Sequence, residues 1–225
     1  TVRELAAKCG IKTSFPMPKL EEMIQKASEK KRRIHFLPPY RGESKMLLGA
    51  LLKENPCQMR TLASVDLIKA VISLRSIKEK IEIEEIEKAV EIAYDMHVTA
   101  MKVCKPGVRE QEIFGTLEGI AFSKGGGTSF PIILSINGQT LHNHSHGNVL
   151  KKDRFMVTDA GAETNLHYSS DITRTTPVGG KFSSMQKDVY EIVLKANSEA
   201  IKAAKPGISN RDVHFVACMI IALGM

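Results

Sequence analysis

The spacing of apolar residues in the second part of the chain predicts two successive helices. Apolar side chains recur at helical spacing from Glu82 to Lys102, and again from Glu110 to Ser123. Between them, the run Lys105-Pro106-Gly107 supplies the residue types that end a helix. A glycine run follows the second helix, and an apolar segment from Phe130 to Ile136 then predicts a strand.

The helix break recurs further along the chain. Lys105-Pro106-Gly107-Val108 returns 100 residues later as Lys205-Pro206-Gly207-Ile208. Helix patterns with similar residues precede both copies, and a further helix pattern follows each. This coincident register predicts an internal duplication. Because few residues follow the second copy, we expect it to lack its strands and the chain to stop in the middle of a domain.

The first 73 residues have a different pattern. A strand is predicted from Arg33 to Pro39, a helix from Glu43 to Lys53, and an apolar helix or strand from Asp66 to Leu74. This alternation indicates part of an α/β unit. The predicted organisation is therefore an N-terminal segment, residues 1–73, followed by a second region, residues 74–225.

A hairpin is predicted between residues 154 and 176. The segment from Arg154 to Thr158 is apolar, and the segment from Tyr168 to Thr176 is rich in β-branched residues. Folding the chain about Asn165 places Asp159 opposite Asp171. The Cβ atoms of directly opposed residues lie about 4.5–5.5 Å apart.

Two carboxylates at that separation repel each other, so one takes a proton or both share a cation. Oxygen ligands from neighbouring strands suit a pair of divalent metals. The alternative is a surface hairpin with two solvated aspartates. The flanking apolar residues Phe155, Met156, Val157 and Ile172 favour burial, and with it the metal site.

Three histidines alternate in the segment Leu141 to His146. A zinc cluster is disfavoured because no cysteine or close acidic residue accompanies them. Two other interpretations stay open: one histidine contacts a substrate carbonyl or transfers a proton, or the segment is a polar loop. We expect His35, His97 and His214 to be packed or exposed without a functional role.

Composition narrows the function classes. The net charge of +7 is dispersed except for Lys30-Lys31-Arg32-Arg33, which we interpret as a solvated helix end and not as a nucleic-acid site. No apolar run is long enough to span a membrane. The four cysteines form no C-x-x-C pair, which predicts buried free thiols in a reducing cytoplasm.

Several motifs together resemble a known family. These are the segments Lys105-Pro106-Gly107, Asp159-Ala160-Gly161-Ala162-Glu163 and Asp171-Ile172-Thr173-Arg174-Thr175, together with His142 seventeen positions before Asp159. They resemble aminopeptidase P and prolidase, the pita-bread metallopeptidases related to methionine aminopeptidase and creatinase. The resemblance is strong over residues 74–225 and weak over residues 1–73.

The resemblance implies an α/β (α+β) fold: an incomplete pita-bread catalytic domain preceded by part of a creatinase-type N-terminal α/β domain. It implies that Asp159 chelates one metal, that Asp171 bridges two, and that His142 contacts the substrate. It also implies that Thr173 supports the metal shell. The implied cofactors are two divalent ions, manganese first, with cobalt, zinc or iron as alternatives. The family usually spaces its two aspartates one position closer, and its remaining His and two Glu ligands match no segment here.

The implied function is hydrolysis, by a metal-bridged hydroxide, of the bond between an N-terminal residue and proline. A prolidase that cleaves Xaa-Pro dipeptides and a metal-free binding protein on the same fold are the alternatives. The implied partners are a peptide with proline in second position and a second copy of the chain, with no membrane and no nucleic acid. We expect the 225-residue chain alone to be inactive.

Overall fold

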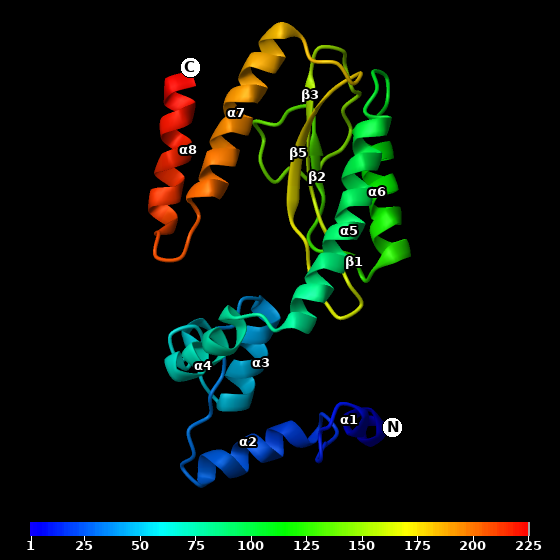
Figure 1. Ribbon diagram of the computed structural model, residues 1–225. Helices are drawn as coiled ribbons and strands as arrows, with labels where there is room; N and C mark the ends of the chain where they lie inside the picture. The colour runs from blue at the N-terminus through cyan, green and yellow to red at the C-terminus, as the bar shows by residue number, and fades with distance from the viewer. Residues whose placement is uncertain (225) are drawn as a thin grey trace. The chain divides into compact units, whose positions relative to one another are not determined.

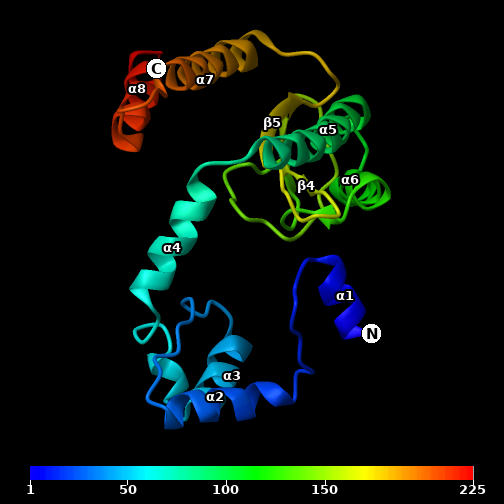
Figure 2. The same cartoon turned by 60° about the horizontal axis from the view of Figure 1, so that its bottom comes forward.

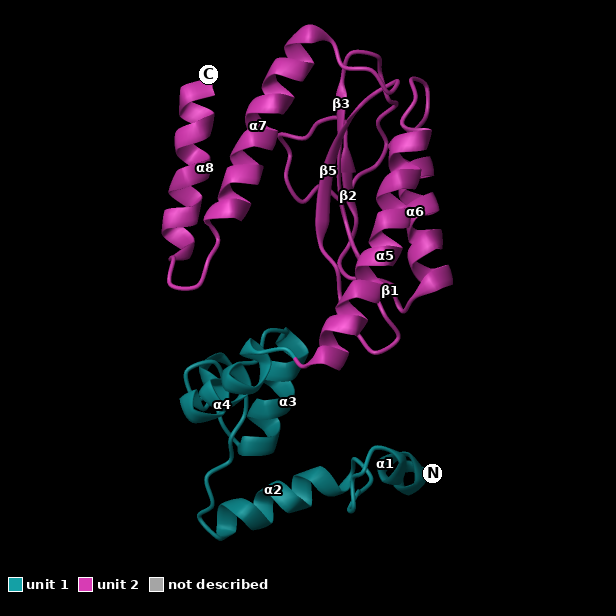
Figure 3. Ribbon diagram, viewed as in Figure 1, with its two compact units in different colours: residues 1–78 teal, residues 79–225 magenta. Residues whose placement is uncertain are grey.

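The computed structural model describes residues 1–224, and the chain divides into two compact units (Figure 3). Unit 1 comprises residues 1–78 and unit 2 comprises residues 79–225. The sequence-predicted boundary after residue 73 lies within the last helix of unit 1.

Unit 1 is helical. Its elements are α1 (Val2–Lys8), α2 (Lys19–Glu29), α3 (Gly42–Leu52), the 3-10 helix η1 (Pro56–Gln58) and α4 (Val65–Ser76). Helix α3 agrees with the helix predicted from Glu43 to Lys53. The segment from Asp66 to Leu74, which the sequence predicted as either a helix or a strand, forms the helix α4. The Ser64 hydroxyl caps α4 by accepting a hydrogen bond from the backbone N–H of Leu67, at 3.2 Å.

The strand predicted from Arg33 to Pro39 does not form. This segment has no regular secondary structure, and the carbonyl of Phe36 accepts a hydrogen bond from the N–H of Ser64 at 3.0 Å. His35 Nδ1 lies 2.7 Å from the same serine's hydroxyl oxygen. A strand needs a partner strand for its backbone groups, and residues 1–78 contain none. The prediction of a strand here is therefore wrong.

Unit 2 contains all the strands of the described chain (Figure 1). Its helices are α5 (Lys80–Val103), α6 (Glu110–Lys124), α7 (Ser184–Ala203) and α8 (Asn210–Gly224). Its strands are β1 (Gly127–Thr128), β2 (Ile133–Ser135), β3 (Phe155–Ala160), β4 (Ala162–Glu163) and β5 (Ile172–Pro177). The strands β2 and β5 are shorter than the sequence predicted.

The main sheet is antiparallel with strand order β2-β3-β5, and a small antiparallel pair joins β1 to β4. Burial along β3 alternates, as expected for a strand with one face on a core. Met156, Thr158 and Ala160 are buried, and the residues between them are only partly buried. The even-numbered face of β3 therefore belongs to the core.

Helices α5 and α6 pack against this core. Met96 of α5 and Leu117 of α6 are fully buried in the same apolar cluster as Leu134 of β2 and Met156 of β3. Burying a side chain of this size contributes about 1.5–3 kcal/mol. These buried side chains fix the position of the central strand against the two helices. The apolar spacing predicted from sequence identifies this face only in part, because three of its residues are exposed: Ile83, Val90 and Tyr94.

The two copies of the repeated motif form equivalent turns. Gly107 joins α5 to α6 with a backbone φ of 90°, and Gly207 joins α7 to α8 with a φ of 88°. Both values lie in the left-handed region that glycine tolerates. The pairs α5–α6 and α7–α8 are two separate helical hairpins (Figure 2), which agrees with the predicted duplication.

Among the described residues, no helix is both long and apolar enough to cross a bilayer. The expectation of buried thiols is correct only for Cys104, because Cys9, Cys57 and Cys218 are exposed. Burial raises the pKa of the Cys104 thiol to about 11. All four cysteines are free.

Candidate functional site

The hairpin that carries the two aspartates forms, but its register differs from the predicted one. Asp159 pairs with Thr173, and Ala160 pairs with Ile172, at the start of β5. The prediction that Asp159 lies directly opposite Asp171 is therefore wrong. Asp171 stands just before β5, two residues along the strand from the partner of Asp159.

The turn explains this shift. Thr164 and Tyr168 close the hairpin through an N–H to carbonyl hydrogen bond of 2.9 Å, which leaves three residues in the loop. The last of them, His167, has a φ of 63°, the left-handed conformation typical of three-residue hairpin loops. The loop is therefore centred on Leu166 and not on Asn165, so the register moves by two residues.

A shift of two residues preserves the face on which a side chain lies. Side chains alternate between faces, so only an odd shift moves them to the opposite side. Asp159 and Asp171 consequently both border one hollow of about 530 Å³ on the face of β3 that is turned away from the core. Its lining residues are Phe130, Pro131, Ile133, His142, His144, Asp159 and Asp171.

Burial differs between the two aspartates. Asp159 is partly buried, whereas Asp171 is exposed. The prediction from the flanking apolar residues fails for Asp171, because its neighbour Ile172 pairs with Ala160 on the core side of the sheet and Asp171 lies on the opposite side. A partly open position keeps both carboxylates accessible to a cation or a ligand from solvent.

Asp159 is oriented by its cross-strand neighbour. The Thr173 hydroxyl donates a hydrogen bond of 2.9 Å to Oδ1 of Asp159. This bond occupies one carboxylate oxygen and leaves Oδ2 for another partner. A hydroxyl that fixes the rotation of a carboxylate is a frequent arrangement around metal ligands.

The three alternating histidines have separate positions. His142 and His144 line the hollow with the aspartates, and both are exposed. His146 is packed instead: its ring stacks on Phe114 with centroids 4.3 Å apart, and its Nδ1 donates to the carbonyl of Leu134 at 3.1 Å. Two of the three alternating histidines therefore lie at the hollow with the aspartates, whereas the family resemblance selects His142 alone.

His97 is a packed residue that contacts the strand on which Asp159 lies. It is 4% exposed, and its Nε2 donates a hydrogen bond of 3.1 Å to the carbonyl of Ala160, the residue after Asp159. Burial lowers the pKa of its imidazole below the ordinary value, so the ring is neutral at pH 7. This agrees with the expectation of a packed histidine.

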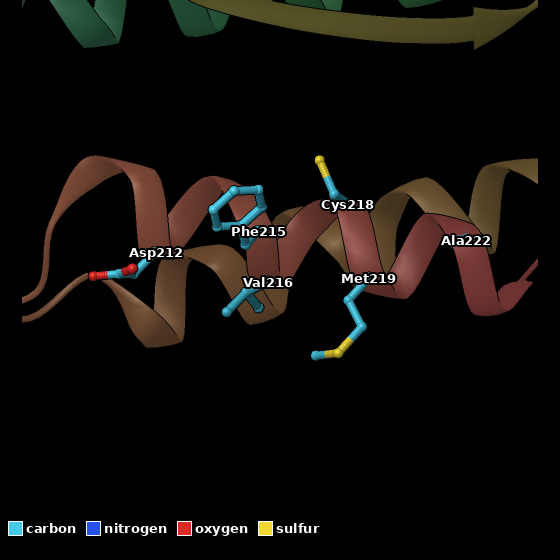
Figure 4. Close-up of a pocket in the computed structure, with 6 residues that line it drawn as sticks. All are labelled: Asp212, Phe215, Val216, Cys218, Met219 and Ala222. Atoms are coloured by element: carbon cyan, nitrogen blue, oxygen red, sulfur yellow. The ribbon is translucent and has the colours of Figure 1, made fainter.

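Another hollow of similar volume, about 530 Å³, lies on α8 and has different chemistry (Figure 4). Its lining side chains project from successive turns of this one helix, and Asp212 is the single ionisable carboxylate among them. Phe215 and Met219 make it apolar. Convergent polar groups distinguish the hollow on β3 as the better candidate site.

Within residues 1–224, no group of three or more histidine, cysteine, aspartate or glutamate side chains is arranged to hold a metal ion. The hollow on β3 nevertheless offers two carboxylates on one face, and one of them is fixed by a threonine. Hard divalent cations prefer such oxygen donors. These residues fit a part of a metal shell.

A family model described as metallopeptidase family M24 matches residues 84–225 of the chain. A probable Xaa-Pro aminopeptidase of Chaetomium globosum is 32% identical over 165 residues, which is 72% of this chain and 28% of that protein. An Xaa-Pro dipeptidase of Pyrococcus furiosus is 37% identical over 159 residues, which is 69% of this chain and 44% of that protein.

Among solved structures, aminopeptidase PepP of Pseudomonas aeruginosa is similar with a TM-score of 0.81 and 25% identity. The match covers 97% of this chain and 51% of that one. The chain thus spans about half, or less, of the length of these relatives. The region matched by the family model, residues 84–225, includes both aspartates, both histidines of the hollow and the two helical hairpins except for the first turn of α5.

Proposed function

Because the chain belongs to metallopeptidase family M24, we propose that the protein hydrolyses the peptide bond between an N-terminal residue and a following proline. The observation that supports this most directly is the hollow on β3. It gathers His142, Asp159 and Asp171, the three residues that the family resemblance selects, from separate segments of the chain.

Each residue has a proposed role that its position supports. Asp159 and Asp171 would hold the divalent metal, and the Thr173 hydroxyl keeps Asp159 in orientation for this role. Bound divalent metal would supply a water of lowered pKa for peptide hydrolysis. His142, exposed at the rim of the same hollow, contacts the substrate.

A dipeptidase is the second candidate, because the Pyrococcus furiosus relative named as an Xaa-Pro dipeptidase is 37% identical. The two activities differ in whether residues after proline are accepted. Parallel assays with an Xaa-Pro dipeptide and an Xaa-Pro tripeptide separate them. Cleavage of the dipeptide alone would identify a prolidase.

A metal-free binding protein on the same fold is the third candidate. The presence of both Asp159 and Asp171 on one face argues against it, because a protein released from metal binding has no need to keep two repelling carboxylates. A full-length protein that binds no manganese and cleaves neither peptide would establish this candidate.

Manganese is the proposed metal, with cobalt, zinc and iron as alternatives. Four free cysteines agree with a proposed location in a reducing cytoplasm. A homodimer is the proposed assembly. The proposed partner is a peptide with proline in its second position.

The hydroxyl of Thr173 provides a test of the metal site. Replacement Thr173→Val keeps the side-chain shape and removes the donor to Asp159. We expect manganese affinity of the full-length protein to fall by about 10–100-fold, the usual effect of losing a group that orients a ligand. Isothermal titration calorimetry measures the change.

The matched control is Thr175→Val on the same strand, β5, outside the hollow with the aspartates. We expect this variant to bind manganese as the unmodified protein does. Equal affinity in the unmodified protein and the Thr173 variant would show that the hydroxyl does not support a metal ligand.

The described chain alone is expected to bind manganese weakly. Divalent ions take four to six ligands, and the hollow on β3 contributes two carboxylates. Titration of the 225-residue chain should give a dissociation constant of about 1 mM or weaker. Tight binding at two sites would show that other side chains of this chain complete the shell.

A further inference from the structure

Glu110, the first residue of α6, is a buried carboxylate outside the proposed metal site. Its exposed fraction is 0%, although acidic residues at a helix start usually face solvent. Burying a carboxylate costs free energy unless donors surround it. The donors that reach Glu110 come from both ends of one loop.

The entrance of the loop, at the end of β2, provides two donors. The backbone N–H of Ile136 donates to Oε1 of Glu110 at 2.7 Å, and the Ser135 hydroxyl donates to the same oxygen at 3.1 Å. The serine hydroxyl also accepts a hydrogen bond from the N–H of Asn137 at 2.9 Å. The carboxylate therefore fixes the point where the chain leaves the sheet.

The exit of the loop provides the remaining donor. The side-chain amide of Asn148 donates to Oε1 and Oε2 of Glu110 at 3.1 and 3.0 Å. The backbone supports the same junction, because the N–H of Glu110 donates to the carbonyl of Asn148 at 3.0 Å. The N–H of Gln111 donates to the carbonyl of His146 at 2.9 Å.

The segment between these ties, residues 137–147, carries His142 and His144, which line the hollow opposite Asp159 and Asp171. Both histidines are exposed, and His142 has a φ of 55°, a conformation that costs free energy outside glycine. A loop in this conformation needs fixed ends. Asn143 also bonds to the backbone of Ser145 within the loop, at 2.8 and 2.9 Å.

We propose that Glu110 is a positioning residue that ties the two ends of loop 137–147 together and so presents His142 and His144 to the hollow on β3. The donors just named are neutral, and the negative charge lies at the amino-terminal end of α6, where the helix dipole favours it. The expected effect of Glu110 on kcat rests on the proposed peptidase function. Its expected effect on the order of loop 137–147 is independent of that function.

The test compares variants of the full-length protein: Glu110→Ala, Glu110→Gln and Asn148→Ala. In Glu110→Ala and Asn148→Ala, amide hydrogen exchange within residues 137–147 should accelerate by roughly tenfold or more, since a charge-assisted hydrogen bond is lost. Amides of α5 and of β3 should change less. In Asn148→Ala the buried carboxylate keeps the hydrogen bonds from Ser135 and Ile136. This variant therefore tests the link between the loop ends even where Glu110→Ala fails to fold.

The conservative variant Glu110→Gln distinguishes loss of the positioning contacts from a general loss of stability. Glu110→Gln keeps an oxygen for Ile136 and Ser135, and Asn148 can rotate its amide to pair with the new donor. We expect it to restore more than half of the lost protection and of kcat. Manganese affinity should stay within about threefold in all variants, because the carboxylates that bind metal lie on the hairpin.

The matched control is Glu112→Ala, also in the first turn of α6 but exposed, where it accepts from the N–H of Arg109 at 3.0 Å. It should leave exchange in loop 137–147 unchanged. Unchanged exchange in both Glu110→Ala and Asn148→Ala would overturn the proposal. If the unmodified full-length protein lacks peptidase activity and the two variants still show accelerated exchange, the proposed function is overturned and the positioning role of Glu110 in the loop is retained.

Discussion

Replacement Asp171→Ala in the full-length protein is expected to reduce cleavage of Xaa-Pro peptides by roughly a thousandfold or more, about 4 kcal/mol of transition-state stabilisation. The proposed role of Asp171 is to hold the metal, and its loss removes one of the two carboxylates of the hollow on β3. The residue is exposed, so stability should change by no more than about 0.5 kcal/mol. Steady-state kinetics and thermal unfolding measure the two effects.

The control is Asp188→Ala, which removes an exposed carboxylate from α7 and should leave turnover unchanged. A second comparison, Asp171→Asn, keeps the shape and removes the charge, and it should be nearly as inactive as the alanine variant. Normal turnover in the two Asp171 variants would eliminate the hollow on β3 as the metal site.

Replacement Gly161→Ala is expected to destabilise the protein by about 3 kcal/mol or more, or to prevent folding. Gly161 separates β3 from β4, directly after the strand that carries Asp159. A Cβ atom there would lie 1.9 Å from the carbonyl oxygen of Ser170 and 2.5 Å from Oγ of Ser129. The carbonyl belongs to the returning backbone of the hairpin and cannot move aside alone.

Urea denaturation of the purified variant measures this effect. The control is Gly119→Ala on an exposed turn of α6, where an added Cβ meets no atom within 4 Å. A helical alanine is favoured over glycine, so this control should gain about 0.5–1 kcal/mol. Unchanged stability of Gly161→Ala would mean that the two sides of the hairpin lie further apart than described.

The helices of unit 2 could be predicted because each one contains its own signal. The range from Glu82 to Lys102 differs from α5 by two residues at one end and one at the other. Hydrogen bonds within a helix are local, so the extent of α5 could be predicted without knowledge of what covers it. Its buried face could not, because Ile83, Val90 and Tyr94 fit the apolar spacing and are nevertheless exposed. The helix-ending motif Lys105-Pro106-Gly107 required only local chemistry.

The strands were less predictable because their partners are distant or absent. The segment from Arg33 to Pro39 is as apolar as a strand, yet residues 1–78 offer it no partner strand. In the hairpin, the register depended on the left-handed conformation of His167. Nothing in the sequence distinguishes a histidine that adopts this conformation from one that does not.

Residues of the candidate site could be predicted where they belong to a sequence motif. They could not be predicted where their role depends on burial by distant segments. His142, Asp159 and Asp171 carry recognisable motifs, and the error of two residues in register left both aspartates on one face. Glu110 resembles an ordinary acidic residue at a helix start. Its significance comes from the two distant segments that enclose it, which no local pattern reveals.

The alternation along β3 separates two kinds of evolutionary change. Substitutions at Met156, Thr158 and Ala160 alter the packing on α5 and α6, and so they act on folding. Substitutions at Asp159 on the other face would alter the proposed metal site, at little cost to that packing. The proposed metal site can therefore be lost by substitution on one face of β3 while the packing on the other face, and with it the fold, is kept.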